Sequence, residues 1–408
     1  MPGALAGLRV VEGSAFVAAP LGGMTLAQLG ADVIRFDQIG GGLDYRRWPV
    51  TQDGQSLYWP GLNKGKRSIA VDLRNKRAQE LLSALIAAPG PDAGIFLTNL
   101  PAHGWCGYDA LSAKRADLIM VLIQGHHDGA TAVDYTVNSA VGMPFVTGPV
   151  GTDGPVNHIL SAWDMITGVS AALSVLAAER HRTRTGAGQL VKIALSDIAM
   201  AMVSHIGHIA EVQINNADRP RYGNDLYGAY GRDFPTRDGQ RVMLAVITAR
   251  QWQGLLDATG IADRAAALER ELCLDFRREG DRFQARERLH ALVGPWIAAR
   301  DLAAVGAAFD QHGQLWGPYQ TFRQMVESDP RCSTANPMFA MVEQPGLGRW
   351  LMPGSPLDFT QLGRIAPARA PRLGEHTDEI LSGLLGLPDH EIAQLHDAKA
   401  VAGPVTPP

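Results

Sequence analysis

Apolar and polar positions follow two periods along the first two hundred residues of the chain. Short apolar runs of strand length lie at residues 8–12, 32–37, 68–73, 93–98, 118–123 and 190–195. Segments with helical spacing separate several of these runs, at residues 20–29, 76–88 and from Asp164 to about Arg184. Strands that alternate with helices are typical of βαβ units. The pattern therefore predicts an α/β fold with a Rossmann-like parallel sheet.

The pattern changes after a long helical segment predicted at residues 197–212. Residues 222–247 are rich in glycine and aromatic side chains and predict short antiparallel strands. Charged helices are predicted from about 249 to 310, and a stretch punctuated by proline and glycine follows. We therefore expect a large domain at 1–215, a smaller α+β domain at 220–336, and a C-terminal segment, 337–408, that returns to the large domain.

Composition narrows the choice of partners and compartment. The chain has 408 residues, of which 46% are hydrophobic and 19% charged, as in ordinary globular proteins. A formal net charge of −4 argues against nucleic acid as a partner. No run of about 20 apolar residues could span a membrane. The three cysteines show no metal or redox spacing, and no signal-peptide pattern opens the chain, so we expect a cytoplasmic protein with reduced thiols.

The candidate for chemistry is Asp164, at the start of the alanine-rich helix. A carboxylate in the first turn of a helix stays ionised and so remains available as a nucleophile, which suits acyl transfer. Ser161-x-x-Asp164 equally fits a capping box, in which both side chains only close the helix end. Gly168 and Ala171 share the helix face of Asp164, and such small residues would let a backbone or ligand approach.

Two basic stretches could bind a phosphorylated ligand. Three glycines at 40–42 precede Arg46 and Arg47, and Lys64 and Lys66 flank Gly65 further along. Flexible backbone beside cations can cradle phosphate oxygens through charge-assisted hydrogen bonds. Surface turns with solvated charges have the same composition, so this pattern leaves both interpretations open.

Other patterns point more weakly to other functions. The loop at 13–20 follows a strand as in dinucleotide-binding proteins, but it lacks GxGxxG, although Asp37 could hold a ribose. The histidines in Gly125-His-His-Asp-Gly129, and His205 with His208, have no further ligands at recognisable spacing. Nicotinamide chemistry is therefore a distant alternative, and we predict no metal.

A series of short motifs extends along nearly the whole chain in a fixed order. They are residues 7–12, Ala18-Ala-Pro20, 29–34, 63–69, Asn99, Asp134-Tyr135, Asp164 with Gly168, 184–189 and 371–381. In this order they resemble the class III CoA-transferase family, which includes CoA-transferases and an acyl-CoA racemase. The resemblance implies a CoA-binding large domain, a substrate that is a CoA thioester, and an interlocked homodimer.

The resemblance also implies roles for individual residues. The aspartate that matches Asp164 is the nucleophile of CoA transfer in this family. The contacts to CoA that it implies are Val17, Ala18, Asn63, Lys64, Gly65, Lys66, Asn99, Asp134 and Tyr135, and the basic residues Arg46 and Arg47 are further candidates for its phosphates.

Differences between this chain and the family pattern reduce the number of candidate activities. The racemases have a His-Asp pair where this chain has Val133-Asp134, and valine cannot carry a proton. The glycine-rich loop of formyl-CoA transferases is not evident. Residues 11–24, 40–45 and 336–345 resemble members that move CoA between the two carboxyls of one methylfumarate, without an external acceptor. An intermolecular transferase for another small acid and a non-enzymatic acyl-CoA binder stay open as alternatives.

Overall fold

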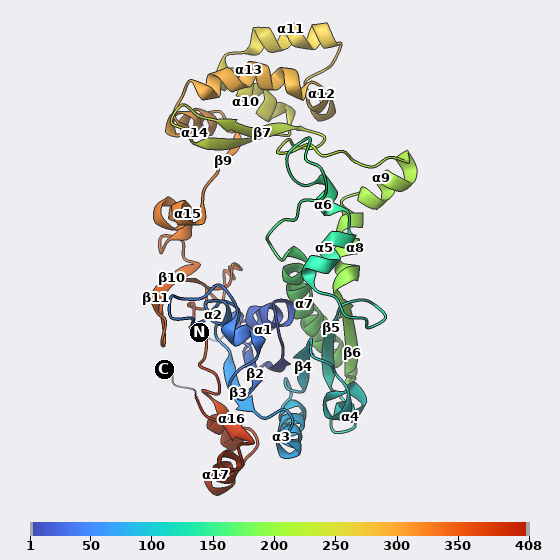
Figure 1. Ribbon diagram of the computed structural model, residues 1–408, viewed down its shortest axis with the longest axis vertical. Coiled ribbons are helices and arrows are strands. Elements are labelled where there is room, and N and C mark those ends of the chain that lie inside the picture. Colours follow the sequence, from blue (N-terminus) through green and yellow to red (C-terminus); the bar gives the residue numbers. More distant parts are fainter. Residues whose placement is uncertain (1–2, 405–408) are drawn as a thin grey trace. The chain divides into compact units, whose positions relative to one another are not determined.

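The computed structural model describes residues 3–404, which divide into two compact units (Figure 1). Unit 1 comprises Met1–Val141, Ile159–Asn215 and Pro330–Pro408, and unit 2 comprises Gly142–His158 and Asn216–Asp329. The predicted small domain, 220–336, missed the first of the two segments of unit 2.

That missed segment is held by one long side chain. The guanidinium of Arg221 donates to the carbonyls of Thr152 at 2.5 Å, Gly154 at 2.8 Å and Pro144 at 3.2 Å. Because these bonds cross about seventy residues of sequence, local patterning gave no sign of them.

Unit 1 contains a seven-stranded sheet with the order β12-β3-β2-β1-β4-β5-β6. The strands are β1 Arg9–Gly13, β2 Asp32–Gln38, β3 Arg67–Val71, β4 Ile95–Thr98, β5 Ile119–Gln124, β6 Gln189–Ala194 and β12 Val401–Ala402. Six strands are parallel, and β12 pairs antiparallel with β3. The order from β3 to β6 is that of a doubly wound, Rossmann-like sheet, so the predicted fold class is confirmed.

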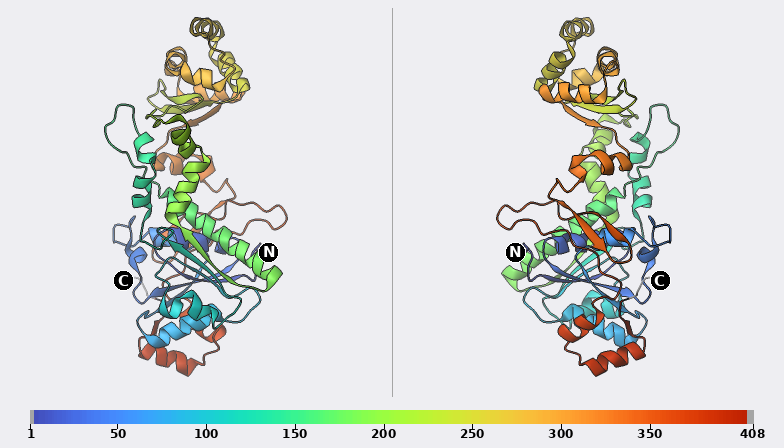
Figure 2. Two further views of the ribbon diagram at one scale, coloured as in Figure 1. Left: turned by 90° about the vertical axis from the view of Figure 1, so that its right-hand side faces the viewer. Right: turned by 90° about the vertical axis from the view of Figure 1, so that its left-hand side faces the viewer.

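Helices cover both faces of this sheet (Figure 2). Along β1, Val10 faces a core formed with α1 Ala18–Gln28 and α7 Ala162–Thr185. Val11 faces the opposite core. The helices of that second layer are α3 Lys76–Ala87, α4 Tyr108–Ser112, α16 Thr377–Gly383 and α17 Asp389–Asp397. Burial on both faces explains why the strands read as continuous apolar runs.

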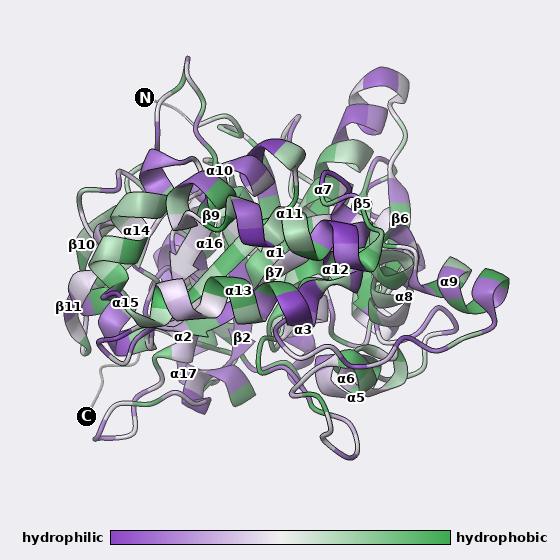
Figure 3. Cartoon of the chain, turned by 90° about the horizontal axis from the view of Figure 1, so that it is seen from above, coloured by the Kyte–Doolittle hydropathy of each residue, from purple (hydrophilic) through white to green (hydrophobic). Residues whose placement is uncertain are grey.

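Unit 2 contains a three-stranded antiparallel sheet, β7-β8-β9, packed against helices. Its elements are α6 Met143–Val146, β7 Tyr230–Pro235, β8 Arg241–Val246, α10 Ala249–Thr259, α11 Ala262–Leu272, α12 Glu279–Gln284, α13 Arg286–Ala298, α14 Leu302–Gln311, β9 Leu315–Pro318 and α15 Phe322–Ser328. These helices carry both hydrophilic and hydrophobic residues (Figure 3). Phe276, Leu289 and Val305 are among the side chains buried in its core.

Several elements of unit 1 depart from the sequence prediction. The helix predicted at 197–212 is two helices, α8 Leu195–His205 and α9 His208–Asn215, because Gly207 between them has a φ of +89°. The stretch after 336 contains an unpredicted hairpin. The remaining elements of the unit are η1 Leu43–Arg46, α2 Tyr58–Leu62, η2 Gly104–Cys106, α5 Asp134–Ala140, η3 Pro330–Cys332, β10 Phe339–Gln344 and β11 Gly348–Pro353.

Within residues 3–404, we find no single helix whose length and apolar character would let it cross a membrane. Helices α13 and α14 meet that criterion only as a pair, and their axes differ by 116° across the break.

Candidate active site

The loops at the carboxyl ends of β1 and β4 meet where the strand order reverses, which is the usual ligand site of a doubly wound sheet. Asn99 follows β4, and its side chain holds the loop after β1. Its Oδ1 accepts the N–H of Ala15 at 2.9 Å, and its Nδ2 donates to the Ala15 carbonyl at 2.7 Å. Asn99 therefore fixes this loop from inside the fold, a role that the predicted CoA contact did not include.

The next residue of the loop, Phe16, has a left-handed backbone with a φ of +64°. Its N–H donates to Oδ2 of the buried Asp44 at 2.8 Å. A non-glycine residue in this region is strained and persists only where its surroundings fix it, which is common at functional sites. Asp44 and Asn99 supply that constraint from either side.

A buried network of charges underlies the loop. The Arg35 guanidinium donates two hydrogen bonds of 3.0 Å to Asp37 and lies 3.5 Å from both Glu12 and Asp44. Lys66 Nζ donates to Glu12 at 2.9 Å, and burial lowers the pKa of Lys66 to about 8 although Glu12 opposes that effect. Asp37 is thus occupied by Arg35, which removes the ribose contact considered for a nicotinamide cofactor.

The same network changes the predicted phosphate contacts. Lys66 Nζ also donates to Asn63 Oδ1 at 2.9 Å, and both side chains are buried. Lys64 Nζ donates to the Gly61 carbonyl at 2.5 Å, and burial lowers the pKa of Lys64 to about 8. Both ammonium groups are buried and held by protein acceptors, which argues against the phosphate contacts considered for them from the sequence. Burial of the two lysines that flank Gly65 was not evident in the local pattern.

For residues that the fold leaves exposed, the predicted contact with CoA stays a proposal. Gly65 is exposed, with a φ of +74°, and Arg46 is also exposed. Tyr135 is 56% exposed, at the start of α5. Val17 and Ala18 are buried at the beginning of α1, so they could meet a ligand mainly through backbone groups.

Asp164 lies in the first turn of α7, as predicted, but it does not form the expected capping box. Ser161 is the N-cap residue and its side chain accepts no capping hydrogen bond. The cap comes instead from Asp134, whose Oδ2 accepts the N–H groups of Trp163 at 2.8 Å and of Asp164 at 3.1 Å. Asp134 is buried and therefore positions the helix end. The carboxyl group of Asp164 is left free for chemistry.

The surroundings make this carboxyl a stronger base than an ordinary aspartate. Burial raises the pKa of Asp164 to about 6; the negative charge of Asp134 adds to that effect, and the positive charge of Arg47 opposes it. At neutral pH most of the Asp164 carboxyl groups are therefore still ionised. An ionised but more basic carboxylate is a better nucleophile toward a thioester carbonyl.

Close packing brings the first turn of α1 against α7, one helical turn after Asp164. A Cβ atom added to Gly168 would lie 2.7 Å from the Ala18 carbonyl oxygen and 3.0 Å from Leu21 Cβ. Gly168 is four residues after Asp164 and shares its helix face. The small residues of α7 thus allow a close backbone approach, as their sequence suggested.

Arg47, Phe16 and Tyr58 complete the surroundings of Asp164. The Arg47 guanidinium lies 5.1 Å from the Phe16 ring centroid and 5.0 Å from that of Tyr58. The Tyr58 hydroxyl is buried without a hydrogen-bond partner in the described part of the chain, and burial raises its pKa to about 12. Neither Phe16 nor Tyr58 was predicted from the sequence to belong to the site. Phe16 followed a predicted strand and could have been suspected, whereas nothing marked Tyr58.

A cluster in unit 2 has the residue types of a metal site. Ligand atoms of Asp225, Glu287 and His290 lie within 4.8 Å of one another. The guanidinium groups of Arg232 and Arg286 each lie 3.6 Å from Asp225 and would compete with a metal cation for its carboxylate. The predicted absence of a metal stays a prediction.

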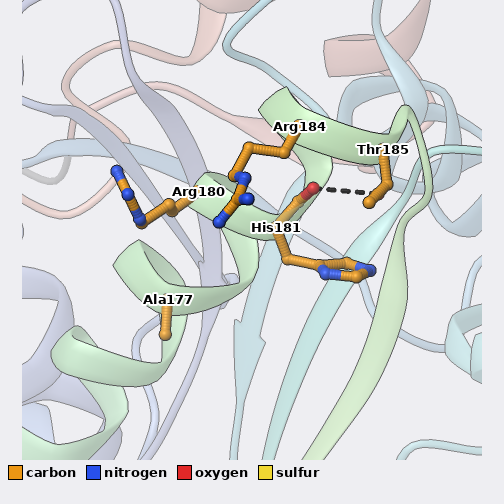
Figure 4. A pocket seen from close by; sticks show the side chains of 5 residues that line it. All are labelled: Ala177, Arg180, His181, Arg184 and Thr185. Carbon is orange, nitrogen blue, oxygen red and sulfur yellow. Dashed lines mark hydrogen bonds between the residues drawn. The ribbon is translucent and has the colours of Figure 1, made fainter.

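A separate basic pocket of 450 Å³ lies at the far end of α7 (Figure 4). Arg180, His181 and Arg184 line it, and Thr185 Oγ1 donates to the His181 carbonyl at 2.8 Å. At a rise of 1.5 Å per residue, these residues lie about 20–30 Å from Asp164 along the helix. The pocket therefore does not belong to the candidate active site. Its cations complement the negative end of the helix dipole.

Comparison with known proteins agrees with this geometry. Residues 5–377 match the model of the CoA-transferase family III. The chain is 63% identical to 2-methylfumaryl-CoA isomerase of Chloroflexus aurantiacus, over 99% of both chains. It is 28% identical to succinyl-CoA:mesaconate CoA-transferase of Haloarcula marismortui, over 93% of this chain and 96% of the relative.

A solved structure shows the same fold. The CAIB/BAIF family protein of Brucella suis superposes with a TM-score of 0.77 at 24% identity, over 94% of this chain and all of the other. Sequence and fold thus agree, and this chain belongs to the CoA-transferase family III.

Proposed function

We propose that this protein is an intramolecular CoA-transferase that converts 2-methylfumaryl-CoA into 3-methylfumaryl-CoA through an acyl-enzyme on Asp164. The observation that supports it most is the basic carboxyl of Asp164 in the first turn of α7, which packs against the start of α1, the helix that follows β1. The relative at 63% identity is named for this isomerisation, and its likeness extends along the whole chain.

The first half of the reaction transfers CoA to the enzyme. The Asp164 carboxylate attacks the C1 thioester carbonyl, the carbon–sulfur bond breaks, and a mixed anhydride and CoA thiolate form. The thiolate then attacks the aspartyl carbonyl of the anhydride. This step gives an aspartyl-CoA thioester and mesaconate, with no net gain or loss of protons.

The second half repeats these steps at the other end of the acid. Mesaconate turns within the site, and its C4 carboxylate attacks the aspartyl-CoA thioester, which gives a new anhydride and thiolate. Attack of thiolate on the C4 carbonyl releases 3-methylfumaryl-CoA and regenerates the Asp164 carboxylate. Each tetrahedral intermediate needs hydrogen-bond donors for its oxyanion.

The N-terminus of α1 offers such donors. Val17, its N-cap residue, provides no capping side chain, and the N–H groups of Ala18 and Ala19 belong to the first turn, which has no acceptors within the helix. These two N–H groups are proposed to stabilise negative charge on the acyl oxygen or on a phosphate of CoA.

One experiment separates this function from its main alternative. Purified 2-methylfumaryl-CoA is incubated with the enzyme, alone in one sample and with ¹³C-labelled free mesaconate in a second, and the product thioester is analysed by mass spectrometry. Intramolecular transfer predicts conversion to equilibrium in the first sample and no label in the product of the second. A requirement for free acid would establish an intermolecular transferase, an activity supported by the 28% identical relative that is named for mesaconate. No conversion under any condition would favour a non-enzymatic acyl-CoA binder.

An interlocked homodimer is part of the proposal. Apolar side chains on α7, α8 and α9, and Ile206 between the last two, are exposed in the single chain; those on the helices include Leu173, Met200, Val212 and Ile214. Contiguous exposed apolar surface often marks an interface. Sedimentation equilibrium should give the mass of two chains, and a monomer would remove this part of the proposal. A cytoplasmic location is proposed as well, consistent with three free cysteines.

A further inference from the structure

The proposed reaction places a second carboxylate of the substrate beside Asp164. After CoA moves to the enzyme, free mesaconate carries two negative charges close to the carboxylate of Asp134. Retaining this dianion requires a cation that no protein carboxylate already occupies. Arg35 and Lys66 are committed to Glu12, Asp37 and the buried network.

Within residues 3–404, Arg47 is a cation that no carboxylate occupies. Its N–H donates to the Asp44 carbonyl at 3.2 Å, and its carbonyl accepts from Ser56 Oγ at 2.6 Å, so the backbone is anchored on both sides. Its guanidinium lies against the Phe16 and Tyr58 rings. Among residues 3–404 it forms no salt bridge or side-chain hydrogen bond.

We propose that Arg47 binds the free carboxylate of the substrate and so selects thioesters of dicarboxylic acids over those of monocarboxylic acids. This inference rests on the proposed function and names the group that the proposed reaction needs. A guanidinium presents paired N–H donors that match a carboxylate in a bidentate arrangement. It would hold the C4 carboxylate before transfer and the C1 carboxylate afterwards.

The packing of the loop after β1 places Arg47 near the first turn of α7. Its guanidinium lies 5.1 Å from the centroid of the Phe16 ring, and Ala18, two residues after Phe16, packs against Gly168 of α7. In agreement with this placement, the positive charge of Arg47 opposes the rise in the pKa of Asp164. Tyr58 contacts Arg47 through its ring and is affected by the charges of both Arg47 and Asp164. The unpartnered, buried hydroxyl of Tyr58 is then a second donor for the same carboxylate.

The role of Arg47 as a carboxylate anchor differs from the phosphate contact predicted from sequence. A phosphate contact would support every CoA thioester equally. A carboxylate contact supports only substrates with a second carboxyl group. The two roles therefore differ in substrate dependence, and a pair of matched thioesters separates them.

The test compares 2-methylfumaryl-CoA with (E)-2-methylbut-2-enoyl-CoA, in which a methyl group replaces the free carboxylate. The measured quantity is the single-turnover rate of thioester loss in the presence of hydroxylamine, which traps the activated aspartyl group. Arg47→Gln should lower the rate with the dicarboxylic thioester roughly 10- to 100-fold, the effect of one charged hydrogen-bonding partner. The rate with the monocarboxylic thioester should change little.

Three further variants serve as controls. Arg47→Lys keeps the charge without the paired donors and should recover part of the lost rate. Tyr58→Phe should lower the rate with the dicarboxylic thioester less than Arg47→Gln does. Arg74→Gln, at a side chain that is 94% exposed, should leave both rates unchanged. The Kd of free CoA, measured by calorimetry, should be the same for wild type and Arg47→Gln.

The outcomes distinguish this inference from the proposed function. Equal loss of rate with both thioesters, or a weakened Kd for CoA, would overturn the role of Arg47 and return it to phosphate binding. Unchanged rates in Arg47→Gln would also overturn it. Failure of the wild-type protein to lose either thioester to hydroxylamine would instead refute the acyl-enzyme itself.

Discussion

Asp164→Asn should make the protein more stable at neutral pH while it abolishes turnover. Burial, followed by the charge of Asp134, raises the pKa of Asp164 from 3.8 to about 6. The folded state therefore binds a proton at this carboxyl more tightly than the unfolded chain does. Ionisation of Asp164 opposes folding, and a neutral asparagine removes that opposition.

The size of the effect follows from the same values. The difference between 3.8 and about 6 corresponds to about 3 kcal/mol of unfolding free energy. Because the side chain is only partly buried, solvent screening reduces the expected gain to about 1–2 kcal/mol. The penalty is absent below about pH 4, grows between pH 4 and 6, and is complete above about pH 6.

Thermal unfolding at pH 5, 6, 7 and 8 measures this gain. Asp164→Asn should raise the Tm by about 1–3 °C at pH 8 and by about half of that at pH 5. Asp109→Asn, at an exposed aspartate in the first turn of α4, is the matched control and should show no such pH dependence. A variant less stable than wild type at pH 8, or a gain independent of pH, would refute the account of Asp164.

Three other substitutions test the surroundings of the site. In the wild type, kcat/KM should fall as pH decreases through about 6, because Asp164 becomes protonated. Asp134→Asn keeps an oxygen for the helix N–H groups but removes a negative charge, so it should move this midpoint to lower pH. An unchanged pH profile would contradict the effect of Asp134 on the pKa of Asp164. Gly168→Ala should cost about 1–3 kcal/mol in chemical denaturation and lower kcat, because its Cβ atom meets the Ala18 carbonyl at 2.7 Å; Gly280→Ala, which meets open space, should do neither. Lys66→Met removes one of the two cations beside the buried Glu12 and should lower the free energy of unfolding, measured by chemical denaturation, by about 3 kcal/mol, whereas a neutral effect would show that the Lys66–Glu12 pair is dispensable.

Sequence patterns predicted the helices and strands whose formation depends on residues close together in the chain. The six parallel strands of unit 1 were found because burial on both faces makes each of them a largely continuous apolar run. Helix α7 was found from its composition and from Gly186, which ends it with a φ of +75°. The position of Asp164 in its first turn followed from these signals and from the resemblance to the family.

Features that depend on distant residues were missed. The cap of α7 comes from Asp134, 30 residues before Asp164, so the cap by Ser161 that the local sequence also allowed does not form. Lys64 and Lys66 read as surface cations, but the folded chain buries both of them. A short stretch of sequence shows neither the distant partner of a side chain nor whether that side chain is buried in the folded protein.

The most direct test of the account is the identity of the residue that carries the activated acyl group. The enzyme is incubated with 2-methylfumaryl-CoA and hydroxylamine, digested, and its peptides are analysed by mass spectrometry. The account predicts an aspartyl hydroxamate at Asp164 that forms only when the thioester is present. A hydroxamate at another carboxyl group, or product formation with Asp164 always unmodified, would contradict it.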